Sequence, residues 1–515
     1  MRTKGSPRIV SKALITVSTG ARIGAIDPRV YGSFVEHLGR CVYDGIYEPQ
    51  HPTADEQGFR EDVLALVREL GVTTVRYPGG NFVSGYRWED GVGPREQRPV
   101  RRDLAWHSTE TNEVGLHEFA HWNRKAGSEP MLALNLGTRG ELEALDLVEY
   151  TNLPAGSALS DQRVANGAQE GFGVRMWCLG NEMDGPWQLG HRDAVDYGKL
   201  ASRTAKALRQ LQPDLELVVC GSSGAAMPTF GTWERQVLEQ SYDDVDFISA
   251  HAYYEPHDGD VDSFLASAVD MDRFIDVVAA TADHVKAEKR SDKTIFISFD
   301  EWNVWYLSRY EDVDKITGDD DWPKAPRLLE DVYTVTDAVV VGSLLISLLK
   351  HADRVKSASL AQLVNVIAPI MTEPGGSAWR QTTFHPFAIT ARLGRGEALR
   401  AEIAGPTIPT KRFGDVSAVD AVVTRDAEAG TAAVFLVNRS RTEPITVSVA
   451  LHGLGGVSIT ETATLADDDL EAVNTAAEPD RVTPSPNDSA TVSDGSLTIT
   501  LPPVSWTAVG LTAEG

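Results

Sequence analysis

Residues 175–184 read Arg-Met-Trp-Cys-Leu-Gly-Asn-Glu-Met-Asp, and the interpretation of the whole chain starts from this stretch. Its centre, 176–179, is a short apolar run that stops at Gly180, Asn181 and Glu182. A buried parallel strand is apolar through its length and polar only where it emerges. If this strand belongs to a barrel, Asn181 and Glu182 lie at the C-terminal rim, where such folds carry their catalytic residues.

A second stretch has the same form. Residues 295–303 read Ile-Phe-Ile-Ser-Phe-Asp-Glu-Trp-Asn, which is apolar through Phe299 and ends with Asp300 and Glu301. Two glutamates at the ends of two strands predict a hydrolase that works with a pair of carboxyl groups.

The rest of the chain supplies enough strands to close a barrel. Strand-like runs cover residues 30–37, 73–80, 131–136, 176–182, 215–220, 246–254, 295–303 and 357–367. Helical patterns lie between most of them, at 57–70, 117–126, 193–211, 263–288 and 327–351. Strands that alternate with helices indicate a parallel sheet, and eight is the number that closes into a (β/α)8 barrel. Glu182 and Glu301 would then end strands four and seven, facing one another across the mouth.

The last part of the chain has a different pattern. After residue 391 the sequence breaks into short strands that alternate apolar and polar residues, such as 445–449 and 497–501. This pattern predicts an antiparallel β-sandwich, jelly-roll-like, over residues 392–515. Residues 13–18 form an early strand without a helical partner, so we expect residues 1–25 to join the sandwich and residues 26–391 to form the catalytic barrel.

Composition narrows the function classes. Apolar residues make up 42% of the 515 and charged residues 24%, as in an ordinary soluble globular protein. The net charge of −26 and the lack of a long basic run argue against a nucleic-acid partner. No window approaches the ~18 uninterrupted apolar residues of a membrane span, and no signal-peptide core follows the basic N-terminus. We therefore expect a cytoplasmic protein with no membrane partner, whose three cysteines are buried free thiols.

The two glutamates are more informative together than singly. An Asn-Glu pair alone is compatible with a solvated loop, and Trp302 is compatible with barrel packing as well as with stacking on a sugar ring. His251 and Tyr253, however, end the strand that lies between the two glutamates. Cleavage of a glycosidic bond needs a proton donor and a group that meets the positive charge on the sugar, and two carboxyl groups can supply both.

At this point the sequence resembles a known family. Six ordered motifs carry the resemblance: Tyr-Gly-Ser-Phe-Val-Glu-His at 31–37, Arg-Tyr-Pro-Gly-Gly-Asn-Phe-Val-Ser-Gly-Tyr at 76–86, Leu-Gly-Asn-Glu-Met-Asp at 179–184, Ser-Ala-His-Ala-Tyr at 249–253, Asp-Glu-Trp-Asn at 300–303 and Gln-Leu-Val-Asn-Val-Ile-Ala-Pro at 362–369. They are similar to those of family 51 glycoside hydrolases, which are retaining α-L-arabinofuranosidases of a clan with the acid/base on strand four and the nucleophile on strand seven. The resemblance covers nearly the whole chain.

The resemblance implies a role for most site residues. Glu182 would be the acid/base and Glu301 the nucleophile, and no cofactor or metal would be needed. By this resemblance Glu36, Asn81, Trp106, Asn181 and Gln362 would bind the sugar, and Tyr253 would hydrogen-bond the nucleophile. The residues themselves suggest two further substrate-binding positions, since His251 ends the intervening strand and Trp305 offers a flat ring that suits a sugar. The expected activity is exo-acting release of terminal α-L-arabinofuranosyl residues from arabinan, arabinoxylan or short oligosaccharides, by a homo-oligomer that would be a hexamer.

Three alternatives remain open from sequence. An endo-acting β-glycanase could use the same scaffold, and a carbohydrate-binding protein could leave both glutamates idle. The third is a zinc hydrolase, because residues 117–121 read His-Glu-Phe-Ala-His and match a zinc-peptidase signature. Such a site needs a third ligand and an open cleft, whereas this segment should be an outer barrel helix. We therefore expect the match to be a coincidence.

Overall fold

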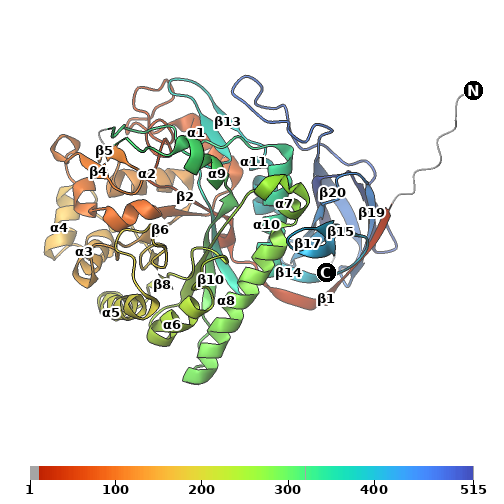
Figure 1. The fold of residues 1–515 in the computed structure, drawn as a ribbon, viewed down its shortest axis with the longest axis horizontal. Coiled ribbons are helices and arrows are strands. Elements are labelled where there is room, and N and C mark those ends of the chain that lie inside the picture. The colour runs from red at the N-terminus through yellow and green to blue at the C-terminus, as the bar shows by residue number, and fades with distance from the viewer. Residues whose placement is uncertain (1–10, 319–320, 514–515) are drawn as a thin grey trace, which may run out of the picture.

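Eight strands form a closed parallel barrel in the computed structural model, which describes residues 11–318 and 321–513 (Figure 1). Around the barrel they are β2 (Gly32–Phe34), β3 (Thr74–Tyr77), β6 (Glu129–Ala133), β7 (Met176–Cys178), β8 (Glu216–Val219), β9 (Phe247–Tyr254), β10 (Phe296–Val304) and β11 (Val355–Leu360). Each strand falls on one of the eight predicted runs. The prediction of a (β/α)8 barrel is confirmed, and β7 and β10 are its fourth and seventh strands.

The strands are apolar because the barrel buries both of their faces. Alternate side chains of the strands form a small core of their own, made by Met131, Ala133, Met176, Cys178, Val218 and Phe247 together with Val83 from the loop after β3. The residues between them, such as Leu132, Trp177 and Leu217, pack outward into the main core beneath the helices. A strand buried in this way carries polar side chains only where it leaves the barrel.

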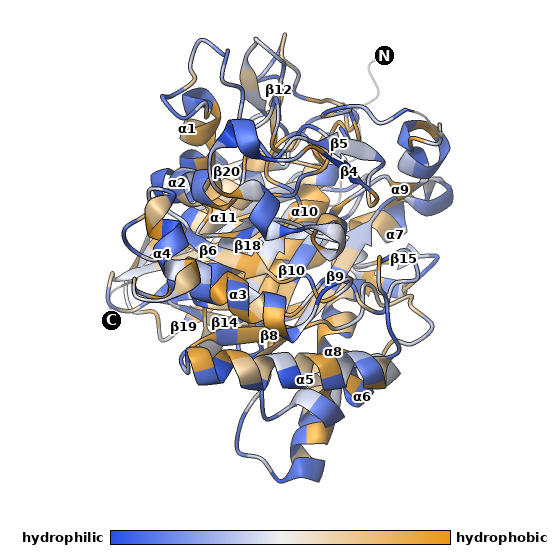
Figure 2. Cartoon of the chain, turned by 90° about the vertical axis from the view of Figure 1, so that its left-hand side faces the viewer, coloured by the Kyte–Doolittle hydropathy of each residue, from blue (hydrophilic) through white to orange (hydrophobic). Residues whose placement is uncertain are grey.

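Each of the five predicted helical stretches overlaps a helix that covers the barrel. These helices are α1 (Glu61–Leu70), α2 (Leu116–Ala126), α5 (Ala194–Leu211), α7 (Val261–Leu265), α8 (Ser267–Lys289) and α10 (Val335–Lys350). Sequence periodicity missed α3 (Glu141–Asn152), α4 (Ala158–Ala165), α6 (Thr232–Ser241) and α11 (Phe384–Leu393). In Figure 2 the outer helix α5 alternates between blue and orange along its length, as expected of a helix with one apolar face.

The prediction of a helix over 327–351 was too long. The helix α10 begins at Val335, where the Thr334 side chain accepts a hydrogen bond from the Asp337 backbone N–H and the Asp337 carboxylate accepts one from that of Thr334. This reciprocal cap fixes the start of the helix. Within the described residues no helix combines the length and the apolar content that a membrane span requires. Residues 1–10, which include the basic N-terminus, lie outside the described residues.

In the described ranges, the loops between the larger elements contain three short hairpins and a one-turn helix. These are the hairpins β4 (Arg101–Asp103) with β5 (Ser108–Glu110), β12 (Ile370–Thr372) with β13 (Ala378–Arg380) and β15 (Thr407–Thr410) with β16 (Gly414–Ser417), and the one-turn helix α9 (Leu307–Arg309). The β4–β5 hairpin follows β3, and α9 lies in the long loop between β10 and α10.

The C-terminal part is one strongly curved sheet of nine strands (Figure 1). Its order is β20 (Val457–Leu465), β23 (Ser505–Ala513), β18 (Thr431–Asn438), β17 (Val419–Asp426), β14 (Glu397–Ala404), β1 (Ser11–Ala25), β19 (Ile445–His452), β22 (Ser496–Leu501) and β21 (Thr491–Ser493). The N-terminal strand β1 thus pairs with β14 and β19, and it is the red strand among blue ones in Figure 1. The β1–β19 pair is parallel, which corrects the expectation of a purely antiparallel sheet. A pair separated by the whole barrel needs no hairpin, so a parallel arrangement is sterically open to it.

Helix α10 joins the barrel to this sheet. All its residues from Val335 to Leu349 are buried. A Cβ placed on Gly342 would lie 2.2 Å from Cδ1 of Trp506, so the helix can approach β23 only because residue 342 has no side chain. Nearby, Arg439 donates to Ser343 Oγ and pairs with Asp420 at 2.6 Å. The division of the chain at residues 25 and 391 stays a prediction.

We predict that Gly342→Ala destabilises the protein even though alanine favours a helix over glycine by about 1 kcal/mol. The added methyl group must displace Trp506, and overpacking of this kind costs about 1–3 kcal/mol. Urea unfolding of this variant should therefore give a lower free energy of unfolding than the wild type. Gly224→Ala is the matched control, because a Cβ at Gly224 would meet nothing within 4 Å. A Gly342→Ala variant as stable as the wild type would show that the helix and the sheet are not in close contact.

Candidate active site

The acid/base candidate Glu182 lies directly after β7. The chain turns sharply at this point, because Gly180 has a φ of 98° and Glu182 itself a φ of 44°. A glutamate in the left-handed region is strained, and such strain is concentrated at functional sites. The turn aims the Glu182 carboxyl into the mouth, where Oε2 accepts a hydrogen bond from Trp187 Nε1 at 2.8 Å.

The nucleophile candidate Glu301 lies within β10 and is fixed by two donors. Arg76 Nη1 donates to Glu301 Oε1 at 2.7 Å, and the Tyr253 hydroxyl donates to Oε2 at 2.7 Å. The Nη2 atom of the same guanidinium donates to Asn181 Oδ1, also at 2.7 Å. One buried arginine on β3 therefore sets the position of Glu301 and of the amide that precedes Glu182.

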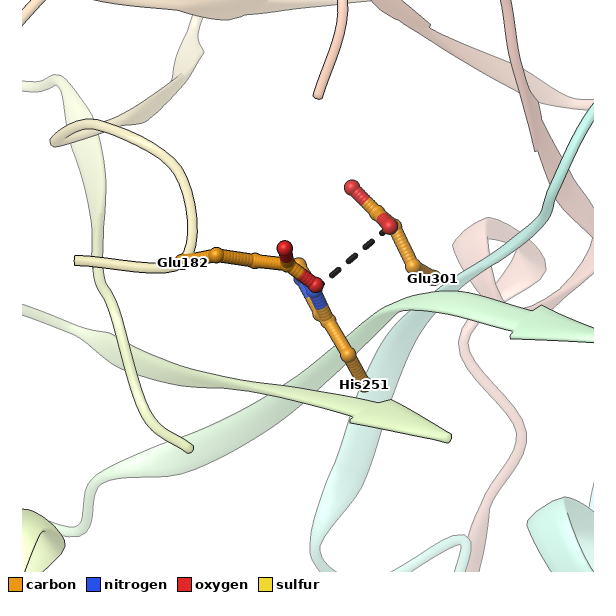
Figure 3. A group of neighbouring side chains, drawn as sticks. All are labelled: Glu182, His251 and Glu301. Atoms are coloured by element: carbon orange, nitrogen blue, oxygen red, sulfur yellow. Dashed lines mark hydrogen bonds and ion pairs between the residues drawn. The ribbon is translucent and has the colours of Figure 1, made fainter. Parts of the chain in front are cut away.

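The two carboxyl groups face each other across His251 (Figure 3). One carboxylate oxygen of Glu182, one of Glu301 and a ring nitrogen of His251 all lie within 4.8 Å of one another. A separation of about 5 Å is typical of retaining glycosidases, whereas inverting enzymes leave about 6.5–9.5 Å for a water molecule. The geometry therefore favours direct attack by one carboxylate.

His251 links both glutamates to a third carboxylate. Its Nδ1 lies 2.9 Å from Glu182 Oε1 and 3.6 Å from Glu301 Oε2, and its Nε2 lies 3.0 Å from Asp300 Oδ1. Burial alone would lower the pKa of His251, but Glu301, Asp300 and Glu182 outweigh it and raise this pKa to about 10. The ring is thus an imidazolium that donates from both nitrogens. Although the spacing of the three residues would suit a metal ion, a protonated ring offers no lone pair to one.

Glu36, at the end of β2, connects three separate loops. Its Oε1 accepts hydrogen bonds from the Phe82 backbone N–H at 2.9 Å and from Trp106 Nε1 at 2.8 Å, and its Oε2 accepts one from Gln362 Nε2 at 3.0 Å. Burial raises the pKa of Glu36 to about 8, against the lowering effect of the Phe82 and Trp106 hydrogen bonds. Among the described residues Gln362 Oε1 has no partner, so it is free to accept from a sugar hydroxyl.

Gly79 and Gly80 let the loop after β3 pass close to this carboxyl. Gly79 has a φ of 146°, and a Cβ there would lie 2.5 Å from Glu36 Cγ. A Cβ on Gly80 would lie 2.9 Å from Glu36 Oε2 and 3.3 Å from Glu301 Oε1. Both positions are therefore glycine because no side chain fits between Glu36 and Glu301.

Aromatic rings line one side of the mouth. Trp106 lies at the tip of the β4–β5 hairpin, and its ring meets that of Tyr310 edge-on at 6.1 Å. Tyr310 contacts Trp305 at the same distance, and Trp305 contacts Tyr253 at 5.0 Å. The Trp305 Nε1 atom is buried and, within the described part of the chain, has no hydrogen-bond partner. This wall joins the hairpin to the end of β9.

The structure brings together the ten residues singled out from sequence. The one contact not described above is Asn181 Nδ2 to Asn81 Oδ1, at 3.3 Å. The site also contains four residues that were not predicted from sequence: Arg76, Asp300, Trp187 and Tyr310. A signal for Arg76 was available, since it is the only charge in the apolar run 73–77 and a buried strand tolerates a charge only when it is paired. Trp187 follows Glu182 in a loop that has no periodicity to read.

The zinc-peptidase match does not form a metal site. His117 Nε2 lies 2.7 Å from the Tyr150 hydroxyl, Glu118 pairs with Arg98 at 2.9 Å, and His121 lies 3.8 Å from Asp55. These partners differ from one side chain to the next, so the two histidines and Glu118 do not converge on one point. The motif is a part of the outer helix α2 that anchors neighbouring loops.

Two family models match most of the chain. Residues 66–273 match the model of the alpha-L-arabinofuranosidase 1 domain, and residues 300–505 match that of the alpha-L-arabinofuranosidase C-terminal domain. An intracellular exo-alpha-(1->5)-L-arabinofuranosidase of Streptomyces lividans is 59% identical over 96% of this chain and 75% of its own length. The chain belongs to the α-L-arabinofuranosidase family. The expectation from the six sequence motifs is confirmed.

Other relatives cover the chain end to end. An exo-alpha-(1->6)-L-arabinofuranosidase of Bifidobacterium longum is 57% identical over 98% of both chains. A solved family 51 alpha-L-arabinofuranosidase of the same species superposes with a TM-score of 0.93 at 54% identity, covering 97% of this chain and 99% of that one. An arabinose complex of a Thermotoga maritima alpha-L-arabinofuranosidase gives 0.85 at 31% identity, with 97% and 99% covered. The chain is therefore a family 51 glycoside hydrolase, and the barrel and the C-terminal sheet together form the family fold.

We predict that the charge on His251 makes folding stability depend on pH. Its pKa is about 10 in the folded state against 6.5 in the unfolded chain, so its contribution is fully present below pH 6.5 and is lost as pH rises towards 10. His251→Gln removes this contribution. The difference in unfolding free energy between wild type and variant should be largest near pH 6 and should shrink towards pH 10.

Urea unfolding at pH 6, 8 and 10 measures this difference directly. The control is His284→Gln, since His284 lies exposed near the end of α8 and only approaches Glu288, at 3.5 Å. A stability difference for His251→Gln that stays constant, or that grows with pH, would mean that His251 is neutral in the folded state.

Proposed function

We propose that this chain releases terminal, non-reducing α-L-arabinofuranosyl residues from arabinose-containing oligo- and polysaccharides, in an exo mode and with retention of configuration. The observation that carries the proposal is the pair Glu182 and Glu301, whose nearest oxygens lie within 4.8 Å, at the ends of strands four and seven. That spacing is the one a double displacement requires. Glu36, Asn81, Asn181 and Gln362 surround the pair and offer hydrogen-bond partners for a furanose.

Under this proposal Glu301 is the nucleophile. Its two oxygens accept hydrogen bonds from Arg76 and Tyr253, which hold the carboxylate in one orientation toward the space in front of Glu182. Glu182 accepts hydrogen bonds from His251 and from Trp187, and because Trp187 is 54% exposed, Glu182 lies at the more open side of the site. This position suits the group that must reach the leaving oxygen.

The reaction would run in two steps. In the first, a Glu301 oxygen bonds to the anomeric carbon as the glycosidic C–O bond breaks, and the proton of Glu182 passes to the departing oxygen. In the second, Glu182 takes a proton from water, the water oxygen bonds to the anomeric carbon, and the ester to Glu301 breaks. Two inversions give net retention. His251 and Arg76 would hold the two carboxyl groups in place through both steps.

Substrate, assembly and location extend the proposal by family resemblance. The relatives are named for two different linkages, (1->5) and (1->6). The proposal therefore specifies the terminal arabinofuranosyl group and not its linkage to the next sugar. By family resemblance we infer a homo-oligomer, a hexamer as bacterial members of the family often are, that acts inside the cell, as the names of several relatives state. The close carboxyl pair favours a glycosidase over an idle binding module, and the separate partners of His117, Glu118 and His121 argue against the zinc hydrolase.

We predict that removal of each glutamate has a different chemical consequence. Glu182→Ala deletes the proton donor, so kcat/KM on substrates with poor leaving groups should fall by about 10²–10⁴-fold. Aryl arabinofuranosides with good leaving groups should still form the intermediate, and added azide should release it as an arabinosyl azide of retained configuration. Glu301→Ala deletes the nucleophile, so azide could attack only from the vacated face and would give the inverted azide.

Product configuration by NMR distinguishes these outcomes. Glu288→Ala, on the exposed face of α8, is the control and should match the wild type. Retained azide from Glu301→Ala together with inverted azide from Glu182→Ala would reverse the two roles. A loss smaller than about tenfold in both variants would contradict the two-carboxylate mechanism itself, since general acid–base catalysis alone contributes more.

A further inference from the structure

Two loops from different strands meet above the site. The β4–β5 hairpin follows β3, and the second loop runs from the end of β10 to α10. The order of the barrel is β10, β11, β2, β3, so these loops arise from the two strands that flank β11 and β2. Gln362 follows β11 and Glu36 follows β2. The two loops therefore approach each other from either side of the residues proposed to bind the sugar hydroxyls.

The loops are joined by a set of contacts that we name the loop bridge, formed by His107, Thr109, Trp322 and Pro323. The His107 ring stacks on the Trp322 ring with centroids 3.8 Å apart and planes 22° apart. Thr109 Oγ1 donates to the Trp322 carbonyl at 2.6 Å, and the Thr109 backbone N–H donates to the Pro323 carbonyl at 2.9 Å. His107 Nε2 also lies 2.8 Å from the Gly318 carbonyl, which can only accept, so this nitrogen carries the proton.

The loop bridge is adjacent to Trp106, which touches the pocket. Trp106 precedes His107 at the hairpin tip, donates to Glu36 Oε1 and meets Tyr310 of the β10–α10 loop edge-on. Asp103 accepts hydrogen bonds from the Ala105 and Trp106 backbone N–H groups at 3.0 and 3.2 Å, so the tip is a compact turn. A displacement of His107 would therefore move Trp106 with it.

The backbone of His107 points to a role for its side chain. Its φ is 53°, in the left-handed region where a residue with a Cβ is strained and where glycine fits without cost. A residue that served only to turn the chain would be better placed here as glycine. The imidazole instead makes two contacts with the opposite loop, which offset the strain.

We propose that the loop bridge is a positioning element for the glycone pocket. It holds the hairpin against the β10–α10 loop, so that Trp106 stays on Glu36 and forms a closed wall around the terminal sugar. His107 and Trp322 act through Trp106 and touch no reacting atom. The inference rests on the proposed function, because it assumes that an arabinofuranosyl group occupies the pocket beside Glu36.

The decisive variant is His107→Gly, which removes both imidazole contacts and at the same time relieves the backbone. The hairpin should fold as well as before, so we expect the thermal midpoint to stay the same or to rise. The Michaelis constant for 4-nitrophenyl α-L-arabinofuranoside and the inhibition constant of free L-arabinose should both rise about tenfold, with kcat within about threefold of the wild type, because a loosened wall weakens sugar binding more than chemistry.

Two further variants separate stacking from bulk. Trp322→Phe keeps an aromatic ring for His107 and should retain both constants near the wild-type values, whereas Trp322→Ala should behave like His107→Gly. His284→Ala, on α8, is the matched control for loss of an imidazole and should leave every constant unchanged.

The kinetic constants and the thermal midpoint of His107→Gly test the loop bridge. A His107→Gly variant with wild-type KM and inhibition constant would overturn the proposal, and so would one whose thermal midpoint falls while kcat and KM change together. Failure of the wild type itself to hydrolyse the aryl arabinofuranoside would refute the proposed function and the inference with it. Hydrolysis by the wild type with no effect in His107→Gly would refute the loop bridge alone.

Discussion

The buried guanidinium of Arg76 is the contact on which the geometry of the site depends. Its side chain is 1% exposed, and from β3 it reaches Glu301 in β10 and Asn181 after β7. A third carboxylate, Asp300, lies 3.7 Å from its Nε atom. An unpaired charge in this interior would cost several kcal/mol, so the arginine is stable only while its partners are in place. The register of three strands and the position of the proposed nucleophile are thus set by the same interaction.

Charge pairing explains why so many ionisable groups can share one small volume. Arg76 and the imidazolium of His251 together face the carboxylates of Asp300 and Glu301, so each buried charge has a partner of opposite sign. Asp300 lies between the two cations, and although burial opposes ionisation, Arg76 and His251 lower the pKa of its carboxyl. Around this rigid centre, the hairpin and the β10–α10 loop supply the walls of the pocket. The reacting groups thus lie at the ends of barrel strands, whereas loops shape the substrate site, as is common in enzymes.

Much of the fold and both glutamates could be predicted because the barrel buries both faces of its strands. An apolar run that ends in Gly-Asn-Glu or Asp-Glu marks a strand and its catalytic end at once, so even the three-residue strand β7 was found. Pattern alone could not supply partners. The sequence shows a charged residue within a strand at Arg76, but it does not identify the three side chains that Arg76 contacts. It also does not indicate that Trp187 donates a hydrogen bond to Glu182. Helix α10 is buried on every side, so the periodicity of its apolar residues does not indicate which face packs against Trp506. The strands of the β4–β5 hairpin have three residues each, too few to show an alternation of apolar and polar residues.

The central claim is that Glu301, held in position by Arg76, forms the covalent bond to the sugar. A 2-deoxy-2-fluoro-α-L-arabinofuranosyl derivative with a good leaving group tests it most directly, because the fluorine slows both steps while the leaving group speeds the first, so the intermediate accumulates. Peptide mass spectrometry of the inactivated protein should find the sugar on the peptide that contains Glu301, and at Glu301 itself. A label on Glu182, on any other residue, or on no residue of an inactivated enzyme would contradict the account.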